Sequence, residues 1–292
     1  MTGSGDQHKP GAHPHHHAHI ATADQGAPIG QIVTVGLIVA VLGGAGLWYL
    51  NRKGEDNKLN TLFNSADARH IGTSNGQRGN MTLSDGSTLQ IGPATKLTII
   101  PDYNKQFRGI MVDGTIAMDV KASPNTPLEI RAGGGAIVLD SGSVVVRSYA
   151  DEGDGYIKLT AGKGLVRAKQ VRREVTAPAV LHIGKDSSLS DADPAQADLA
   201  TSWAGGKVQI KDMPLKDVLT LFTKYYALTM KVADDALLTR PVTMEADLDS
   251  KQKAIDALQA SALVKFGYDG STPILRDDPT AAAKAAAKAK KK

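Results

Sequence analysis

The sequence predicts a mainly β protein with three structured parts: a single transmembrane helix, a β-rich domain of sandwich or solenoid-like architecture, and a small α+β module of order β-α-β-β-α-β. Three observations support this fold class. An apolar run without a charged residue comes first, strand-like runs with glycine-containing turns follow, and apolar residues then take helical spacing beyond Trp203. The expected boundaries are 1–28 for a disordered histidine-rich tail, 29–50 for the transmembrane helix, 51–72 for a linker, 73–185 for the β domain, 186–202 for an interdomain linker, 203–276 for the α+β module and 277–292 for an Ala/Lys-rich tail.

The composition excludes several classes of function. Of the 292 residues, 41% are hydrophobic, which supports a buried core, but only 4% are aromatic, which argues against stacking platforms for bases or sugars. The chain has no cysteine, so disulfides, thiolate metal sites and a cysteine nucleophile are excluded. Removing the five lysines of the last nine positions from the 34 basic residues leaves 29 against 30 acidic residues. Because the rest of the chain is nearly neutral, we expect no nucleic acid partner.

The run at 29–50 is long enough to cross a bilayer, which takes about 20 apolar residues. Trp48–Tyr49 close the run and Arg52–Lys53 follow it, as expected where an aromatic belt meets lipid headgroups. A cleaved signal peptide is the alternative, since Gly44–Gly46 offers small residues. The long preceding region, which is poor in Lys and Arg, favours the transmembrane helix.

Turn signals divide the predicted β domain. Asp85-Gly86 lies between two short strand-like runs and predicts a hairpin. Similar units follow around Asp113-Gly114, Gly133–Gly135 and Gly162. The even spacing of these signals indicates an all-β domain.

The period changes in the predicted α+β module. We expect strands at 207–210, 229–232, 242–245 and 263–268, and helices at 215–226 and 250–260. Pro214 suits the first turn of the first helix.

Five groups of residues occur together in one known family. They are Leu83–Ser87 with Leu89 and Leu97, Arg108–Gly109 with Val112–Gly114, Pro127–Ile130, Leu159–Gly164, and Trp203–Lys207 with Pro214–Leu219 and Tyr225–Tyr226. In this order they resemble FecR-type proteins, which are membrane-anchored periplasmic regulators of extracytoplasmic-function sigma factors. The resemblance covers residues 73–276 and implies a FecR-like β domain followed by a domain similar to the STN module of TonB-dependent transducers and secretins.

The resemblance implies a regulator that acts in signal transduction through protein–protein contacts and is not an enzyme. The partners it implies are the membrane and other envelope proteins, such as a TonB-dependent transducer or a larger membrane complex. Family members that hold a sigma factor do so through a helical cytoplasmic segment, whereas residues 1–28 show no helix pattern. A structural or accessory scaffold subunit of an envelope complex, without sigma-factor binding, is therefore the alternative.

Two indications of topology disagree. Arg52, Lys53 and Lys58 follow the predicted helix and only Lys9 precedes it, so the positive-inside rule places the large domains in the cytoplasm. The resemblance implies a single-pass inner-membrane protein with a cytoplasmic N-terminus and periplasmic C-terminal domains. We expect the second arrangement, because the family motifs are the more specific signal.

The only candidate ligand site is a weak one. His13, His15, His16, His17 and His19 are imidazole ligands that suit a divalent metal, although a flexible tail offers them no fixed geometry. No other cofactor and no catalytic residue is expected. Asp85, Asp113 and Asp140 stand in turn contexts, where their side chains cap the backbone.

The remaining histidines, His70 and His182, suit structural roles. Gly133–Gly135 lacks the Lys-Ser/Thr ending of a phosphate loop. For partner contact we name Trp203, Tyr225 and Tyr226, with core packing as the alternative role for each.

Overall fold

The computed structural model describes residues 57–123, 126–281 and 283, which belong to one compact unit of the chain. Strands account for 47% and helices for 23% of it, so the prediction of a mainly β fold is confirmed. The predicted transmembrane helix at 29–50 lies outside the described residues. Within them, no helix has both the length and the apolar character needed to span a bilayer.

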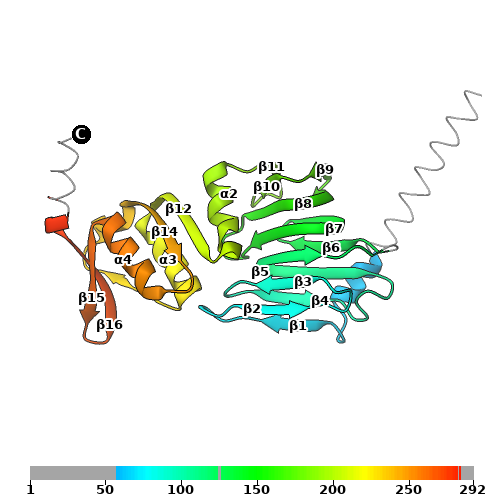
Figure 1. Ribbon diagram of the computed structural model, residues 1–292, viewed down its shortest axis with the longest axis horizontal. Helices are drawn as coiled ribbons and strands as arrows, with labels where there is room; N and C mark the ends of the chain where they lie inside the picture. The colour runs from blue at the N-terminus through cyan, green and yellow to red at the C-terminus, as the bar shows by residue number, and fades with distance from the viewer. Residues whose placement is uncertain (1–56, 124–125, 282, 284–292) are drawn as a thin grey trace, which may run out of the picture. The chain divides into compact units, whose positions relative to one another are not determined.

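Eleven strands of the β domain form a single sheet (Figure 1). They are β1 (Arg69–Gly72), β2 (Gly79–Thr82), β3 (Thr88–Ile91), β4 (Lys96–Ile99), β5 (Arg108–Val120), β6 (Leu128–Ala132), β7 (Gly135–Ser148), β8 (Gly155–Ala168), β9 (Val171–Thr176), β10 (Ala179–Ile183) and β11 (Leu189–Asp191). The order along the sheet is β1-β4-β5-β6-β7-β8-β10-β11, with β2 joined through β3 and β9 attached to β8. As expected, Asp85-Gly86 lies in the turn from β2 to β3.

Two of the predicted turns are bends within long strands. β5 continues through Asp113-Gly114, and β8 continues through Gly162. At its bend β5 changes partners, because its first half pairs with β4 and β6 and its second half with β3 and β7. Gly114 has a φ of 135°, and a Cβ there would lie 2.4 Å from Thr95 Oγ1, so the bend requires glycine. The Asp-Gly pair indicated that the chain changes direction here. Whether it reverses into a hairpin or only bends within one strand depends on the strands that pair with it.

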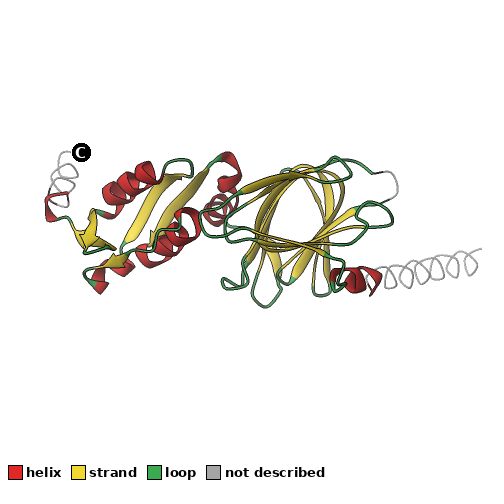
Figure 2. Cartoon of the chain, turned by 90° about the horizontal axis from the view of Figure 1, so that it is seen from below, coloured by secondary structure: helices red, strands yellow, loops and turns green. Residues whose placement is uncertain are grey.

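The exchange of partners divides the sheet into two layers around one core (Figure 2). One layer contains β1, β4, β6 and β9, and the other contains β2, β3, β10 and β11. The long strands β5, β7 and β8 run through both layers. This two-layered arrangement corresponds to the sandwich alternative of the prediction.

Alternation of side chains along the strands fills the space between the layers. In β3, for example, Leu89 and Ile91 are buried and Thr88 and Gln90 are exposed. Each fully buried Leu or Ile side chain contributes about 1.5–3 kcal/mol to folding. The core therefore depends on the strand register, since a shift of one residue would expose these side chains.

The chain continues into two short helices and the α+β module. These elements are α2 (Pro194–Thr201), the 3-10 helix η1 (Ser202–Gly205), β12 (Lys207–Pro214), α3 (Leu215–Tyr226), β13 (Lys231–Val232), η2 (Asp235–Thr239), β14 (Pro241–Asp247), α4 (Lys251–Ala262), β15 (Val264–Asp269) and β16 (Thr272–Asp277). The module contains the predicted elements and one further strand, β16. β12 pairs with β14, and a second sheet has the order β13-β16-β15. Residues 186–202, expected as a linker, contain β11 and α2.

Local signals account for the two longer helices of the module. α3 follows Pro214 and buries Val218, Phe222 and other apolar side chains of one face. Ser250 caps the N-terminus of α4, where its Oγ accepts a hydrogen bond from the Lys253 amide at 3.3 Å. These features are local, which is why helical periodicity predicted both helices.

A helix at residues 57–63 packs on the outside of the β domain. Leu59 and Phe63 form a small cluster with Ile100. A Cβ at Gly109 would lie 3.0 Å from the Phe63 ring, so the missing side chain lets the helix approach β5 closely.

The buried guanidinium of Arg108 joins the ends of several strands. Arg108 is 1% exposed, and its Nη1 lies 3.0 Å from Asp85 Oδ2. The same guanidinium donates to three carbonyl oxygens, those of Lys121 at 2.8 Å, Thr126 at 2.6 Å and Asp140 at 3.0 Å. One side chain therefore connects the β2–β3 turn, the segment after β5 and a residue of β7.

The carboxylate of Asp85 is held in its charged form. Burial acts to raise the pKa of Asp85, but hydrogen bonds from the Ser87 amide, Arg108, the Ser87 hydroxyl and Tyr103 lower it below its usual value. Since the pKa is lower in the folded than in the unfolded chain, this carboxylate stabilises the fold above about pH 4. The contribution is lost as the pH falls through the folded-state pKa.

We expect Asp85→Asn to lower the free energy of unfolding by about 3 kcal/mol, because Arg108 would keep a buried charge without its counter-charge. Urea denaturation of the full chain at pH 7 measures the effect. Asp102→Asn is the control, since its ion pair with Lys105 is exposed and contributes little. Equal stability of the two variants would contradict a structural role of the buried pair.

Candidate functional site at the domain junction

The β domain and the α+β module meet at a buried cluster of charged and aromatic side chains. We call Arg147, Tyr149, Glu152, Lys224 and Tyr225 the junction cluster. Arg147 belongs to β7, Tyr149 and Glu152 follow that strand, and the last two residues lie in the final turn of α3. Both parts of the chain therefore contribute charges to one site.

The geometry of the junction cluster is closely defined. Arg147 Nη2 donates to both carboxylate oxygens of Glu152 at 2.8 Å. Lys224 Nζ lies 2.7 Å from Glu152 Oε1 and 3.1 Å from Asp151 Oδ1. Both cations lie over the Tyr149 ring in cation–π contacts, with Arg147 Cζ at 4.6 Å and Lys224 Nζ at 3.9 Å from the ring centroid. Glu152 thus links the two domains by accepting hydrogen bonds from a cation of each.

Burial makes these charges interdependent. Arg147 is 4% exposed and Lys224 is 7% exposed. Burial acts to lower the pKa of Arg147, but Tyr225 and Glu152 raise it above its usual value, so the guanidinium stays charged. Burial raises the pKa of Tyr225 against the opposing effect of Arg147, so the hydroxyl stays neutral and accepts a hydrogen bond from Arg147 Nη1 at 3.3 Å. Loss of one partner would leave a buried charge uncompensated.

Apolar contacts surround the charged part of the junction. Val145 of β7 belongs to the same buried cluster as Trp203 and the core of the module, and Ala117 packs against that cluster. Two further bonds join the domains, from the Gly76 amide to the Lys224 carbonyl at 2.7 Å and from Arg78 Nη2 to Asp249 Oδ1 at 2.7 Å. The junction is therefore a packed interface and not a single tether.

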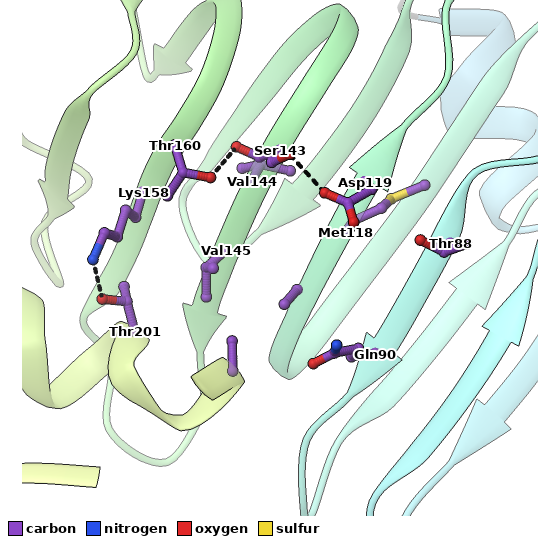
Figure 3. A pocket seen from close by; sticks show the side chains of 12 residues that line it. Thr88, Gln90, Met118, Asp119, Ser143, Val144, Val145, Lys158, Thr160 and Thr201 are labelled. Atoms are coloured by element: carbon purple, nitrogen blue, oxygen red, sulfur yellow. Dashed lines mark hydrogen bonds between the residues drawn. The ribbon is translucent and has the colours of Figure 1, made fainter. Parts of the chain in front are cut away.

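A cavity of about 290 Å³ lies between the outer face of the sheet and the segment of α2 and η1 (Figure 3). Ser143 Oγ donates to Asp119 Oδ1 at 2.6 Å, and Lys158 Nζ lies 3.4 Å from Thr201 Oγ1. The lining residues are Thr88, Gln90, Ala117, Met118, Asp119, Ser143, Val144, Val145, Lys158, Thr160, Thr201 and Ala204. This lining offers hydroxyls, one carboxylate and one ammonium group, which suit the binding of a small polar molecule.

Of the three residues that we named for partner contact, two are buried and the third, Tyr226, is half-buried. Trp203 and Tyr225 are buried, and Trp203 Nε1 has no hydrogen-bond partner among the described residues. The Tyr226 hydroxyl donates to the Asp247 carbonyl at 2.7 Å. A partner would reach Trp203 and Tyr225 only if the two domains separated.

The candidate metal ligands at positions 13–19 lie outside the described residues. Among the residues that are described, no three His, Asp or Glu side chains cluster as metal ligands would. His70 Nδ1 lies 3.1 Å from Thr98 Oγ1, and His182 Nε2 lies 3.5 Å from Asp154 Oδ1. Both contacts suit the structural roles expected of these histidines.

Of the junction cluster, sequence reasoning named only Tyr225 and missed its charged members. Arg147 continues a run of strand residues, and Lys224 stands in a helix without any local sign of burial. They meet through Glu152, which follows β7 and accepts hydrogen bonds from both side chains, and no spacing in the sequence encodes that contact.

The structure thus combines a two-layered β domain with an α+β module, and buried charges couple the two parts. The FecR protein family matches residues 69–167, which span β1 to most of β8. The chain therefore carries a FecR domain, which confirms the FecR-like part of the resemblance seen in the sequence.

Two crystal structures of a "putative anti-sigma factor" from Parabacteroides distasonis ATCC 8503 share the fold. The structure at 2.50 Å has a TM-score of 0.61 and 16% identity, and the match covers 72% of this chain and 99% of that chain. The structure at 1.65 Å has a TM-score of 0.60 with the same identity and coverage. No curated protein matches the chain.

We expect Glu152→Gln to loosen the junction, because Arg147 would lose the carboxylate that compensates its buried charge, at a cost of about 3 kcal/mol. Faster limited proteolysis of the segment between the domains, and a lower urea midpoint, would report the change. Glu174→Gln on exposed β9 is the matched control. If both variants resisted protease as the unaltered chain does, the junction cluster would not hold the domains together.

Proposed function

We propose that this chain is a membrane-anchored, periplasmic signal-transducing regulator of the FecR type that works through protein–protein contacts and not through catalysis. The FecR domain at residues 69–167 carries this proposal. The fold shared with structures described as an anti-sigma factor agrees with it. In this proposal the α+β module meets a partner and the junction cluster passes the change to the FecR domain.

The position of α3 supports such coupling. Lys224 and Tyr225 lie in its last turn, and both contact residues of the FecR domain. A partner that displaced α3 would separate Lys224 from Glu152 and leave Arg147 with fewer compensating groups. Because buried charges tolerate few alternative arrangements, a small displacement at the module would alter the FecR domain.

The edge of the second module sheet is the surface we assign to the partner. β15 is an edge strand, since it pairs only with β16 among the described residues. Tyr268 of β15 is 62% exposed, and its ring packs edge-on against Phe266 at a centroid distance of 5.4 Å. An edge strand can pair with a strand of another protein, and an exposed aromatic side chain adds specific contact area. A TonB-dependent transducer or another envelope protein is the partner we propose.

The proposal also assigns roles to the N-terminal tail and to the predicted helix at 29–50. The predicted helix at 29–50 anchors the chain in the inner membrane, with the N-terminus in the cytoplasm and the later domains in the periplasm. The histidines of the N-terminal tail hold a divalent metal only incidentally, and the regulator needs no cofactor. The alternative function, an accessory scaffold subunit, is favoured by one observation, the absence of a helix pattern in residues 1–28.

Affinity purification of the full chain from detergent-solubilised membranes distinguishes these functions. We expect it to recover a sigma factor or a TonB-dependent transducer, and Tyr268→Glu to reduce the recovery at least about fivefold through charge at the pairing edge. Val171→Glu is the control, because Val171 is exposed on the FecR domain. Stoichiometric recovery of a large membrane assembly without a sigma factor or transducer would instead support the scaffold.

The proposed topology predicts that alkaline phosphatase fused after Lys292 is active, because this enzyme matures only outside the cytoplasm. A fusion after Thr2 should be inactive. Phosphatase activity of cells that carry each fusion, with protein levels checked by immunoblot, measures the outcome. The reverse pattern, with both fusions stably made, would show that the orientation follows the Lys/Arg bias.

A further inference from the structure

The cavity of about 290 Å³ between the outer face of the sheet and the segment of α2 and η1 is lined mostly by polar side chains (Figure 3). We call it the outer-face cavity. Most of its lining comes from four neighbouring strands, β3, β5, β7 and β8, and the rest from Thr201 of α2 and Ala204 of η1. None of its lining residues belongs to the junction cluster.

The strand register fixes which side chains face the outer-face cavity. One row of paired residues across the four strands consists of Gln90, Ala117, Val145 and Lys158. Asp119 stands two residues after Ala117 in β5, so its side chain points to the same face of the sheet. The row has polar ends and two small apolar side chains in its middle. The cavity therefore has an apolar floor with polar groups around it.

The Lys158 ammonium at one side of this floor is held by a neutral group. Its Nζ donates to Thr201 Oγ1 at 3.4 Å, and it forms no ion pair within the part of the chain that the structure describes. The Thr201 hydroxyl donates in turn to the Ala197 carbonyl at 2.6 Å, so it can only accept from the ammonium. An ammonium group has three donors, and Lys158 is only half-buried. It can therefore take an anionic partner as well.

A carboxylate lies on the other side of the floor. Asp119 Oδ1 accepts a hydrogen bond from Ser143 Oγ at 2.6 Å, and Asp119 forms no ion pair among the described residues. In Figure 3, Val145 lies between Asp119 and Lys158. Because β7 separates β5 from β8, the two charged side chains start from strands about 10 Å apart. The cavity thus presents a cation and an anion that do not pair with each other.

We propose that the outer-face cavity binds a dipeptide with free termini and small side chains. The terminal carboxylate pairs with Lys158 and the terminal ammonium with Asp119. A single amino acid carries both charges on one carbon, whereas each further residue separates them by about 3.3–3.6 Å. The cavity volume is close to the lower limit of about 300 Å³ for ligand sites, which keeps the peptide short.

The other lining groups suit the middle of such a peptide. The Gln90 side-chain amide both donates and accepts, as a peptide bond does, and it makes no hydrogen bond with any described residue. Ala117 and Val145 offer apolar contact to alanine-sized side chains. Thr201 and Ala204 belong to the segment between the FecR domain and the module, so a bound peptide contacts both the sheet and this connection.

Calorimetric titration of the full chain in a non-ionic detergent tests the proposal, with L-alanyl-L-alanine as the probe. The acetylated dipeptide lacks the terminal ammonium, the dipeptide amide lacks the terminal carboxylate, and L-alanine lacks the length. We expect saturable binding of the free dipeptide. Each of the other three compounds should bind at least about tenfold more weakly, because each loses a charge-assisted contact.

Two variants assign each terminus to its partner. Lys158→Gln should bind the dipeptide and its amide equally, since the terminal carboxylate has lost its cation. Asp119→Asn should bind the dipeptide and its acetylated form equally. Lys163→Gln on β8 and Asp256→Asn on α4 are the matched controls, because both residues are exposed and neither lines the cavity. The controls should keep the discrimination of the unaltered chain.

Three results would overturn the proposal: no saturable binding of the dipeptide, equally tight binding of L-alanine, or unaltered discrimination by Lys158→Gln and Asp119→Asn. Comparison of the four compounds on the unaltered chain decides the case even if a variant fails to fold. Partner recovery by affinity purification is measured separately, so failure here leaves the proposed regulator function open to its own test.

Discussion

The buried pair of Arg108 and Asp85 is the constraint on which the two-layered domain depends. A guanidinium at 1% exposure is costly unless its donors are satisfied, and the fold meets that demand with one carboxylate and three carbonyl oxygens from separate segments. Each segment is therefore held at a defined distance from the start of β5. Apolar packing supplies most of the stabilisation, but it would tolerate other arrangements of the loops that this hydrogen-bond network excludes.

Carboxylates also hold two cations each at two further places in the structure. In the junction cluster the cations of Arg147 and Lys224 are balanced by nearby carboxylates, which makes a closed contact between two domains. On the outer face of the FecR domain, Glu129 accepts hydrogen bonds from Arg131 and Arg167, which connects β6 with β8. In both places one carboxylate holds two cations that come from separate elements of the chain.

Much of the architecture could be predicted because it depends on local patterns. Helical spacing indicated α3 and α4, alternating strands with glycine turns indicated the β domain, and the motifs that begin at Asp85 indicated the FecR domain. The predicted turn at Asp113-Gly114 was wrong, because Gly114 bends a continuous strand from one layer into the other. The burial of Trp203 and Tyr225 could not be predicted as a domain contact, since aromatic residues at helical spacing suit a core and an interface equally.

The sequence by itself determined the class of fold, the presence of a FecR domain and the order of the secondary structure elements, because these follow from periodicity, turn chemistry and motif order along the chain. Only the tertiary structure decided which side chains meet. Arg147 and Lys224, or Arg131 and Arg167, come together through strand register and domain packing, and the free energy of each contact depends on burial that neighbouring elements provide. Non-local contacts of this kind leave no local pattern, which is why both charged sites appear only in the folded chain.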